Sequence, residues 1–100
     1  MAKLELISPG EILMQGFLEP LAISQNQLAR DIDVPVSRIA GIVKGERSIT
    51  ADTALRFAQY FGTSAEMWMN LQTRHDLRSA QRTTWPKIKG RIRSLPVTQA

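Results

Sequence analysis

The chain of 100 residues contains no cysteine and a single histidine, His75. Without cysteine there can be no disulfide and no thiolate metal site, and a lone histidine has no second imidazole with which to share a metal ion. A nucleophilic triad would have to use His75, which lies in a polar stretch, and the sequence contains no glycine-rich phosphate loop. The sequence therefore predicts no metal, no other cofactor and no enzymatic activity.

Long apolar runs are also missing. No run approaches the roughly 18 residues that a membrane-spanning helix needs, and the first residues lack the apolar core of a secretory signal. Hydrophobic residues make up 43% of the chain, an ordinary fraction for a globular protein. We therefore expect one small cytoplasmic domain with no membrane association.

Acidic residues are scarce in the last part of the chain. Residues 73–100 carry seven Lys or Arg against one acid, a net charge of +6, although the whole chain has a net charge of only +4. Residues 24–47 carry four bases against three acids, or +1. The basic C-terminal segment suits a polyanion such as nucleic acid, with solubility or an acidic protein partner as the alternatives.

Residues 24–45 predict two short helices joined by a tight turn. Ser24 can cap the first helix. Pro35 disfavours helix in the residue before it and is tolerated in a first turn, so the second helix should begin near Pro35. Lys44 and Gly45 supply a basic last turn and a glycine stop. This spacing is typical of a DNA-binding helix-turn-helix. The apolar faces of the pair comprise Leu28, Ala29, Ile32, Ile39, Ile42 and Val43.

One further helix is predicted before this pair, and another after it. The first follows a capping box that opens at Ser8, and it is ended by Pro20. The other has Thr50 as its N-cap and stops at Gly62. The residues expected to face inward at helical spacing are Ile12, Leu13, Gly16 and Phe17 in the first, and Ala51, Ala54, Leu55, Ala58 and Phe61 in the other.

A last helix should open with a capping box at Thr63 and extend to about Arg82. Beyond it, residues 87–93 alternate charged with small or apolar side chains, a pattern that fits a strand, a helix or a disordered tail. We therefore predict a DNA-binding domain over residues 1–82 and a basic tail over residues 83–100. The apolar face of the last helix is Met67, Trp68 and Leu71.

These five predicted helices, with the second and third as a helix-turn-helix, resemble the phage-repressor (Xre/Cro) family of DNA-binding domains. The residues that match this family's pattern are Gln25, Leu28, Ala29, Val34, Ile39 and Gly45. Within the family, the chain is similar to the HigA-type (VapI-like) antitoxins over about residues 8–82. The blocks that carry this narrower resemblance are Pro9–Leu13, Phe17–Leu21, Met67–Gln72 and Asp76-Leu77.

The resemblance implies an all-α, five-helix lambda-repressor-like fold followed by a short basic C-terminal tail. It also implies two roles. The chain would bind its own operator in double-stranded DNA as a homodimer, and it would silence a HigB-type toxin, an mRNA-cleaving ribonuclease of the RelE-like superfamily. A stand-alone repressor without a toxin is the first alternative, and a protein-interaction module that no longer binds DNA is the second.

The second helix of the pair would present its N-terminal residues to base edges in the major groove. Arg38 can bond guanine bidentately, Ser37 can donate or accept a hydrogen bond, and Val36 can pack on a thymine methyl. An ordinary surface role is the alternative for each. The other predicted site residues bond phosphates, buttress the recognition helix or leave room for close approach, and they are Gln25, Lys44, Arg47 and Gly41.

The turn between the two helices departs from the family's pattern. Where the family often has Gly-Val-Ser, this chain has Asp33-Val34-Pro35. The serine cap of the recognition helix is therefore missing, and the fixed φ of Pro35 partly substitutes for it. Asp33 falls where glycine would tolerate a positive φ, which an aspartate adopts less easily.

Overall fold

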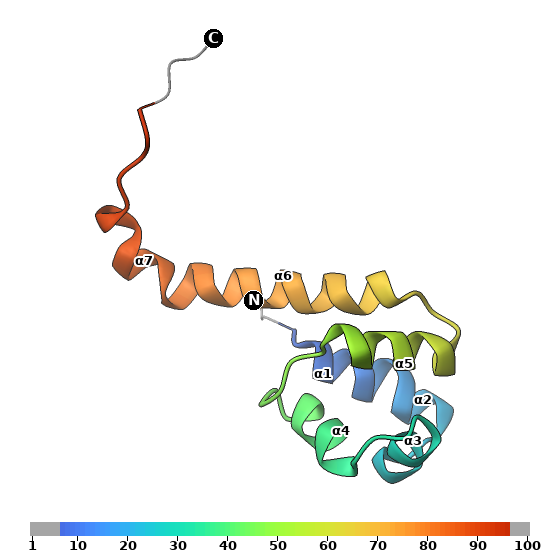
Figure 1. Ribbon diagram of the computed structural model, residues 1–100. Coiled ribbons are helices and arrows are strands. Elements are labelled where there is room, and N and C mark those ends of the chain that lie inside the picture. Colours follow the sequence, from blue (N-terminus) through green and yellow to red (C-terminus); the bar gives the residue numbers. More distant parts are fainter. Residues whose placement is uncertain (1–6, 97–100) are drawn as a thin grey trace.

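The computed structural model describes residues 7–96, and this part of the chain is helical with no strand (Figure 1). The elements are α1 (Pro9–Glu11), η1 (Ile12–Leu18), α2 (Glu19–Leu21), α3 (Gln25–Asp31), α4 (Val36–Val43), α5 (Ala51–Phe61), α6 (Ala65–Thr83), α7 (Trp85–Ile88) and η2 (Lys89–Arg91). The first three follow one another without a break, so residues 9–21 form one helical rod. This rod and α3 to α6 are the five predicted helices, and the all-α prediction is confirmed.

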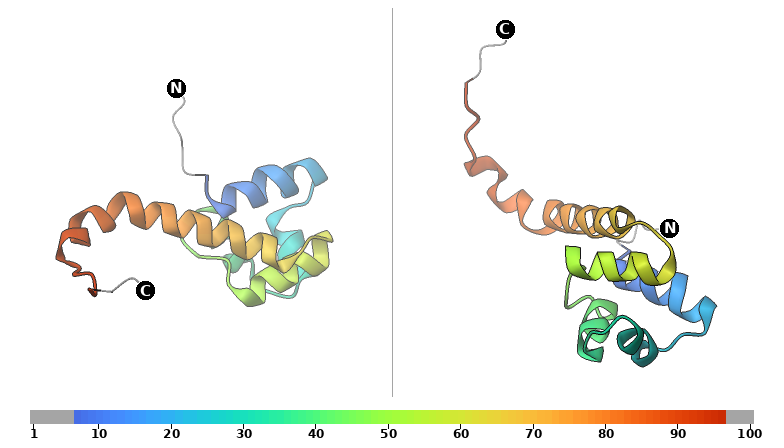
Figure 2. Two further views of the ribbon diagram at one scale, coloured as in Figure 1. Left: turned by 90° about the horizontal axis from the view of Figure 1, so that it is seen from above. Right: turned by 45° about the vertical axis from the view of Figure 1, so that its right-hand side comes forward.

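The ends of the predicted domain and tail, residues 1–6 and 97–100, lie outside the described residues. Within the described range, no helix is both long enough and apolar enough to cross a membrane. Figures 1 and 2 show α6 along one side of the helical body, α3 and α4 on the opposite side, and α5 between them. The segment after α6 extends away from the body as short helical turns, and residues 92–96 have no regular structure.

The first rod begins with the predicted capping box. The Glu11 N–H donates to Ser8 Oγ at 3.1 Å, and the Ser8 N–H donates to Glu11 Oε1 at 2.9 Å. The middle of the rod, η1, is a π-helix. Its wider turn brings residues five apart onto one face, so Leu13 and Leu18 are both buried. Gly16, predicted to face inward on an α-helical period, is exposed.

Pro20 does not end this rod as predicted. The helix continues to Leu21 and stops at Ala22, which adopts a left-handed φ of 55°. Pro20 lies where the π-helical hydrogen bonding gives way to the last α-helical turn. The rod has no N–H to donate at Pro20, and it ends one residue later.

Trp68 is the centre of the hydrophobic core. It is fully buried, and the rings of Phe17 and Phe57 each lie 4.9 Å from it between centroids. Its indole Nε1 donates to Thr63 Oγ1 at 2.8 Å. The N-cap of α6 is Ser64, one residue later than predicted, and Ser64 Oγ accepts the Met67 N–H at 3.0 Å.

Helix α5 begins and ends as predicted, with Thr50 as N-cap and Gly62 as a left-handed C-cap. Its buried face was predicted only in part: Ala54 is buried and Phe61 packs against the core, as expected. Leu55 is 63% exposed and Ala51 is also exposed, whereas the buried side chains of α5 are those of Thr53, Ala54 and Phe57. The helix is oriented so that Phe57 and Phe61, and not Leu55, contact the ring of Trp68.

A buried amide ties the loop after α4 to α6. Gln72 Oε1 accepts the Ile49 N–H at 2.8 Å, and Gln72 Nε2 donates to Asp76 Oδ1 at 2.9 Å. Ile49 is itself buried in the core. The loop that follows α4 is thereby anchored to α6, the longest helix among the described residues.

The start of the first rod packs directly on the end of α4. A Cβ added to Gly10 would overlap the carbonyl oxygen of Ile42 and lie 2.9 Å from Val43 Cα. Both partners are backbone atoms and cannot swing aside. We expect Gly10→Ala to lower the free energy of unfolding by about 1–3 kcal/mol or more, measured by chemical denaturation.

Gly16→Ala in the same rod is the matched control, because the atom nearest to an added Cβ there is 3.9 Å away. Its stability should be unchanged or higher by up to about 1 kcal/mol. Equal effects of the two substitutions would contradict the close approach of α1 and α4.

Candidate nucleic-acid interface

Helix α4 is anchored at its back and exposed along its front. Ile39 and Ile42 are buried, whereas Ser37 is exposed and Val36 retains 43% of its surface. The N-cap is Pro35, which makes no side-chain capping bond. The structure therefore places the predicted reading edge on the surface of the protein, while contact with DNA stays a prediction.

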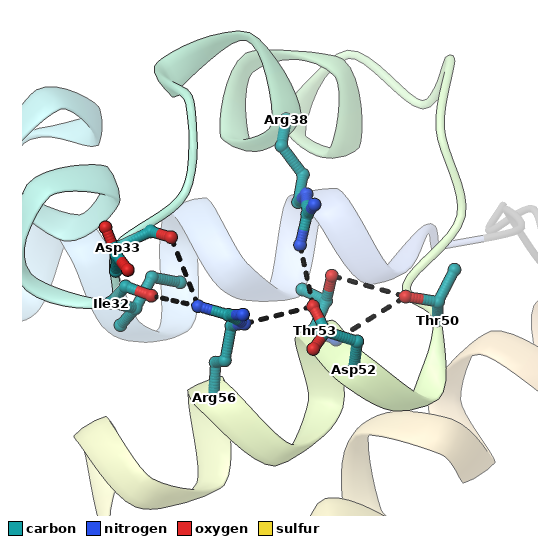
Figure 3. A network of polar contacts seen from close by, with 7 residues as sticks. All are labelled: Ile32, Asp33, Arg38, Thr50, Asp52, Thr53 and Arg56. Carbon is teal, nitrogen blue, oxygen red and sulfur yellow. Dashed lines mark hydrogen bonds and ion pairs between the residues drawn. The ribbon is translucent and has the colours of Figure 1, made fainter.

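The turn before α4 adopts the conformation that the sequence suggested. Asp33 has a φ of 61°, in the left-handed region. Arg56 of α5 holds this turn from the other side: its Nη1 donates to the carbonyl oxygens of Ile32 at 2.7 Å and Asp33 at 3.1 Å (Figure 3). The guanidinium of Arg56 on α5 thus satisfies two backbone carbonyl oxygens in the turn that contains the unfavourable positive φ of Asp33.

The same arginine belongs to a longer network of charges. Asp52, in the first turn of α5, accepts hydrogen bonds through Oδ2 from Arg56 Nε at 3.0 Å and from Arg38 Nη1 at 2.8 Å (Figure 3). The hydrogen bonds from Arg56 and then Arg38 hold the pKa of the Asp52 carboxyl below its ordinary value of 3.8. Asp52 is therefore charged at neutral pH, and it links the turn to the recognition helix.

Arg38 is consequently not a freely extended side chain. Its pairing with Asp52 leaves 29% of the side chain exposed. Neither Asp52 nor Arg56 was predicted as a site residue. Asp52 and Arg56 stand four residues apart in the order that favours an ion pair on a helix, which was the available signal. Nothing in the sequence pairs Asp52 with Arg38, because that contact joins two helices.

The other predicted site residues lie around this centre. Gln25 is half-buried, and its Nε2 lies 4.0 Å from Met14 Sδ, so it contacts the first rod. An added Cβ on Gly41 would lie 3.2 Å from Arg47 Cβ, so the missing side chain makes room for Arg47. Lys44 and Arg47 are exposed at the end of α4. Their contacts with DNA stay predictions.

Comparisons with known proteins agree with this geometry. The helix-turn-helix family matches residues 17–68. A HigA-family addiction module antidote protein from Coxiella burnetii is 41% identical, with a TM-score of 0.83 over 92% of this chain and 100% of that one. The Pseudomonas aeruginosa antitoxin HigA, solved with the higBA promoter, is 40% identical, with a TM-score of 0.86 over the same shares. The chain belongs to the helix-turn-helix family, in its HigA-like group.

Curated relatives of this HigA-like chain cover 70–75% of its length. Virulence-associated protein I of Dichelobacter nodosus is 49% identical over 75% of this chain and 69% of its own length. An uncharacterized HTH-type transcriptional regulator of Haemophilus influenzae is 44% identical over 70% of this chain and 65% of its own length. The predicted family and fold class are confirmed. This family consists of DNA-binding regulators and antitoxins, so the chain is a DNA-binding protein and not an enzyme.

The hold of Arg56 on the turn can be measured as stability. Arg56→Ala removes the donor from the carbonyls of Ile32 and Asp33, and we expect the free energy of unfolding to fall by about 1–3 kcal/mol. Arg74→Ala, an exposed arginine of α6, is the matched control and should change it by less than about 0.5 kcal/mol. Similar small losses for both variants would contradict the role given to Arg56.

Proposed function

We propose that this HigA-like protein binds operator DNA as a homodimer, inserts α4 into the major groove and represses its own operon. The observation that carries the proposal is the exposed edge of α4, backed by buried Ile39 and Ile42, in a chain 40% identical to an antitoxin solved with its promoter. The front of a recognition helix must be exposed and its back rigid for base reading. A two-fold dimer would occupy two half-sites about 10 base pairs apart, or a multiple of that spacing.

Within that interface, we assign base contacts to the N-terminal part of α4. Arg38 offers a guanidinium to guanine, Ser37 a hydroxyl, and Val36 an apolar surface for a thymine methyl. Phosphate contacts belong to exposed groups around them. Lys44 and Arg47 lie just beyond the end of α4, and the first N–H groups of α3, beside Gln25, favour an anion.

The second role concerns a protein partner. Similarity to HigA antitoxins supports neutralisation of a HigB-type toxin, an mRNA-cleaving ribonuclease of the RelE-like superfamily, in the cytoplasm. The division proposed from the sequence assigns DNA binding to residues 1–82 and an auxiliary basic tail to residues 83–100. In the described part, the tail leaves the body on the side of α6, away from α4 (Figure 1).

A stand-alone repressor is the second candidate. The relative from Haemophilus influenzae is described as a transcriptional regulator, with no toxin in its name. The neighbouring reading frame separates the two candidates. A small basic ribonuclease encoded beside this gene, whose growth inhibition is relieved by co-expression of this chain, supports the antitoxin role. A toxin that still inhibits growth at equal expression argues for the repressor alone.

The DNA role is tested by Arg38→Ala in a gel-shift assay with the promoter of the protein's own gene. We expect a loss of about 1–3 kcal/mol in operator affinity and relaxed preference at one base pair, because a bidentate contact is removed. Arg74→Ala on α6 removes the same charge and is the control for general attraction to phosphates: it should leave base preference unchanged, whatever its effect on affinity. Binding of both variants should weaken steeply with salt. Unchanged affinity and preference in Arg38→Ala would remove α4 from the interface.

A further inference from the structure

The guanidinium of Arg38 is oriented by a residue outside the recognition helix. Its Nη1 bonds Asp52 Oδ2 at 2.8 Å, across 14 positions of sequence. Asp52 is in turn fixed by Arg56, whose Nε lies 3.0 Å from the same oxygen. Arg56 also grips the turn that precedes α4. The position of Asp52 is therefore fixed relative to both α4 and the turn before it (Figure 3).

The bond to Asp52 uses Nη1 of the Arg38 guanidinium and leaves the edge formed by Nε and Nη2 available for another partner. Among residues 7–96, no hydrogen bond or ion pair involves Nε or Nη2 of Arg38. Two adjacent N–H groups on one edge are what a bidentate bond to guanine O6 and N7 requires. An arginine already fixed on one nitrogen loses less side-chain freedom when it binds than an unrestrained arginine does.

The charge of Asp52 has a second effect on DNA binding. A carboxylate that is 57% exposed beside the reading edge repels phosphates, and this repulsion acts on every DNA sequence alike. Pairing with Arg38 also removes part of the attraction that a free arginine would exert on any phosphate. Asp52 thus weakens non-specific binding while it orients the group that distinguishes bases.

We infer that Asp52 is a positioning residue for DNA recognition, which sets the orientation of Arg38 and thereby the base pair that Arg38 reads. The inference rests on the proposed function, since it assigns a specificity role within the same interface. It adds a residue of α5 to a reading site otherwise built from α4.

The test compares full-length wild type with Asp52→Asn in selection from a library of randomised DNA duplexes, read by sequencing. We expect preference at one base pair of each half-site to fall by roughly 5- to 10-fold, a part of the discrimination of an arginine–guanine pair. Affinity for arbitrary duplex DNA should stay equal or rise. The matched control is Glu66→Gln, an acid in the first turn of α6 as Asp52 is in α5. It should leave base preference unchanged.

A double-mutant cycle separates positioning from a general structural effect. If Asp52 acts through Arg38, Asp52→Asn should change base preference in the wild-type background and not in the Arg38→Ala background. The melting temperature of each variant shows whether it is folded. Equal loss of preference in both backgrounds, or an unchanged preference in Asp52→Asn, would overturn the inference.

Failure of the proposed function would look different. If the wild-type protein selects no sequence from the library and does not shift its own promoter, then the DNA role itself is wrong. If the wild type selects a clear half-site that Asp52→Asn selects equally well, the DNA role stands and only the assignment of Asp52 falls.

Discussion

The grip of Arg56 on the turn between α3 and α4 is the contact on which the proposed interface depends. A helix-turn-helix reads DNA only if its second helix is held at a fixed angle, and the connecting turn sets that angle. In this chain the turn contains a non-glycine residue, Asp33, at a φ of 61°, and no serine caps the helix that follows. Two hydrogen bonds from the Arg56 guanidinium to the carbonyl oxygens of Ile32 and Asp33 tie this turn to α5.

The hydrophobic core also helps to hold α4 at a fixed position. Trp68 and the aromatic rings around it fix α6 against the first rod and α5. From that base, Gln72 reaches the loop after α4, and Gly10 lets the first rod meet the end of α4 backbone to backbone. The recognition helix is thus held at its start by charges and at its end by close packing. Its front edge is left exposed.

The sequence predicted most of this fold because its helix boundaries are marked by local chemistry. Capping residues such as Ser8, Ser24 and Thr50, and the glycine stop at Gly62, act over three or four positions and are visible without a structure. The errors arose where tertiary packing overrides the local pattern. The π-helix in the first rod changes which residues face inward, and Thr63, the predicted cap of α6, bonds Trp68 of the core while Ser64 caps the helix.

The same distinction between local sequence signals and tertiary contacts applies to the candidate site. The exposed edge of α4 could be placed from helical periodicity alone, since Ile39 and Ile42 mark its opposite face. The pairing of Arg38 with Asp52 could not, because it depends on how two helices are placed in space. The sequence therefore identified the arginine that we expect to read a base, and missed the aspartate that orients it.

The central claim is that the front of α4 enters the major groove, and the absence of cysteine from the chain permits a direct measurement. A single cysteine introduced by Ser37→Cys can carry a DNA-cleaving iron chelate, with Thr73→Cys on α6 as the matched exposed site. On promoter DNA, the reagent at position 37 should cut at two symmetrical places inside the protected region, and the reagent at position 73 should not. Cutting from position 73 and none from position 37 would contradict the account.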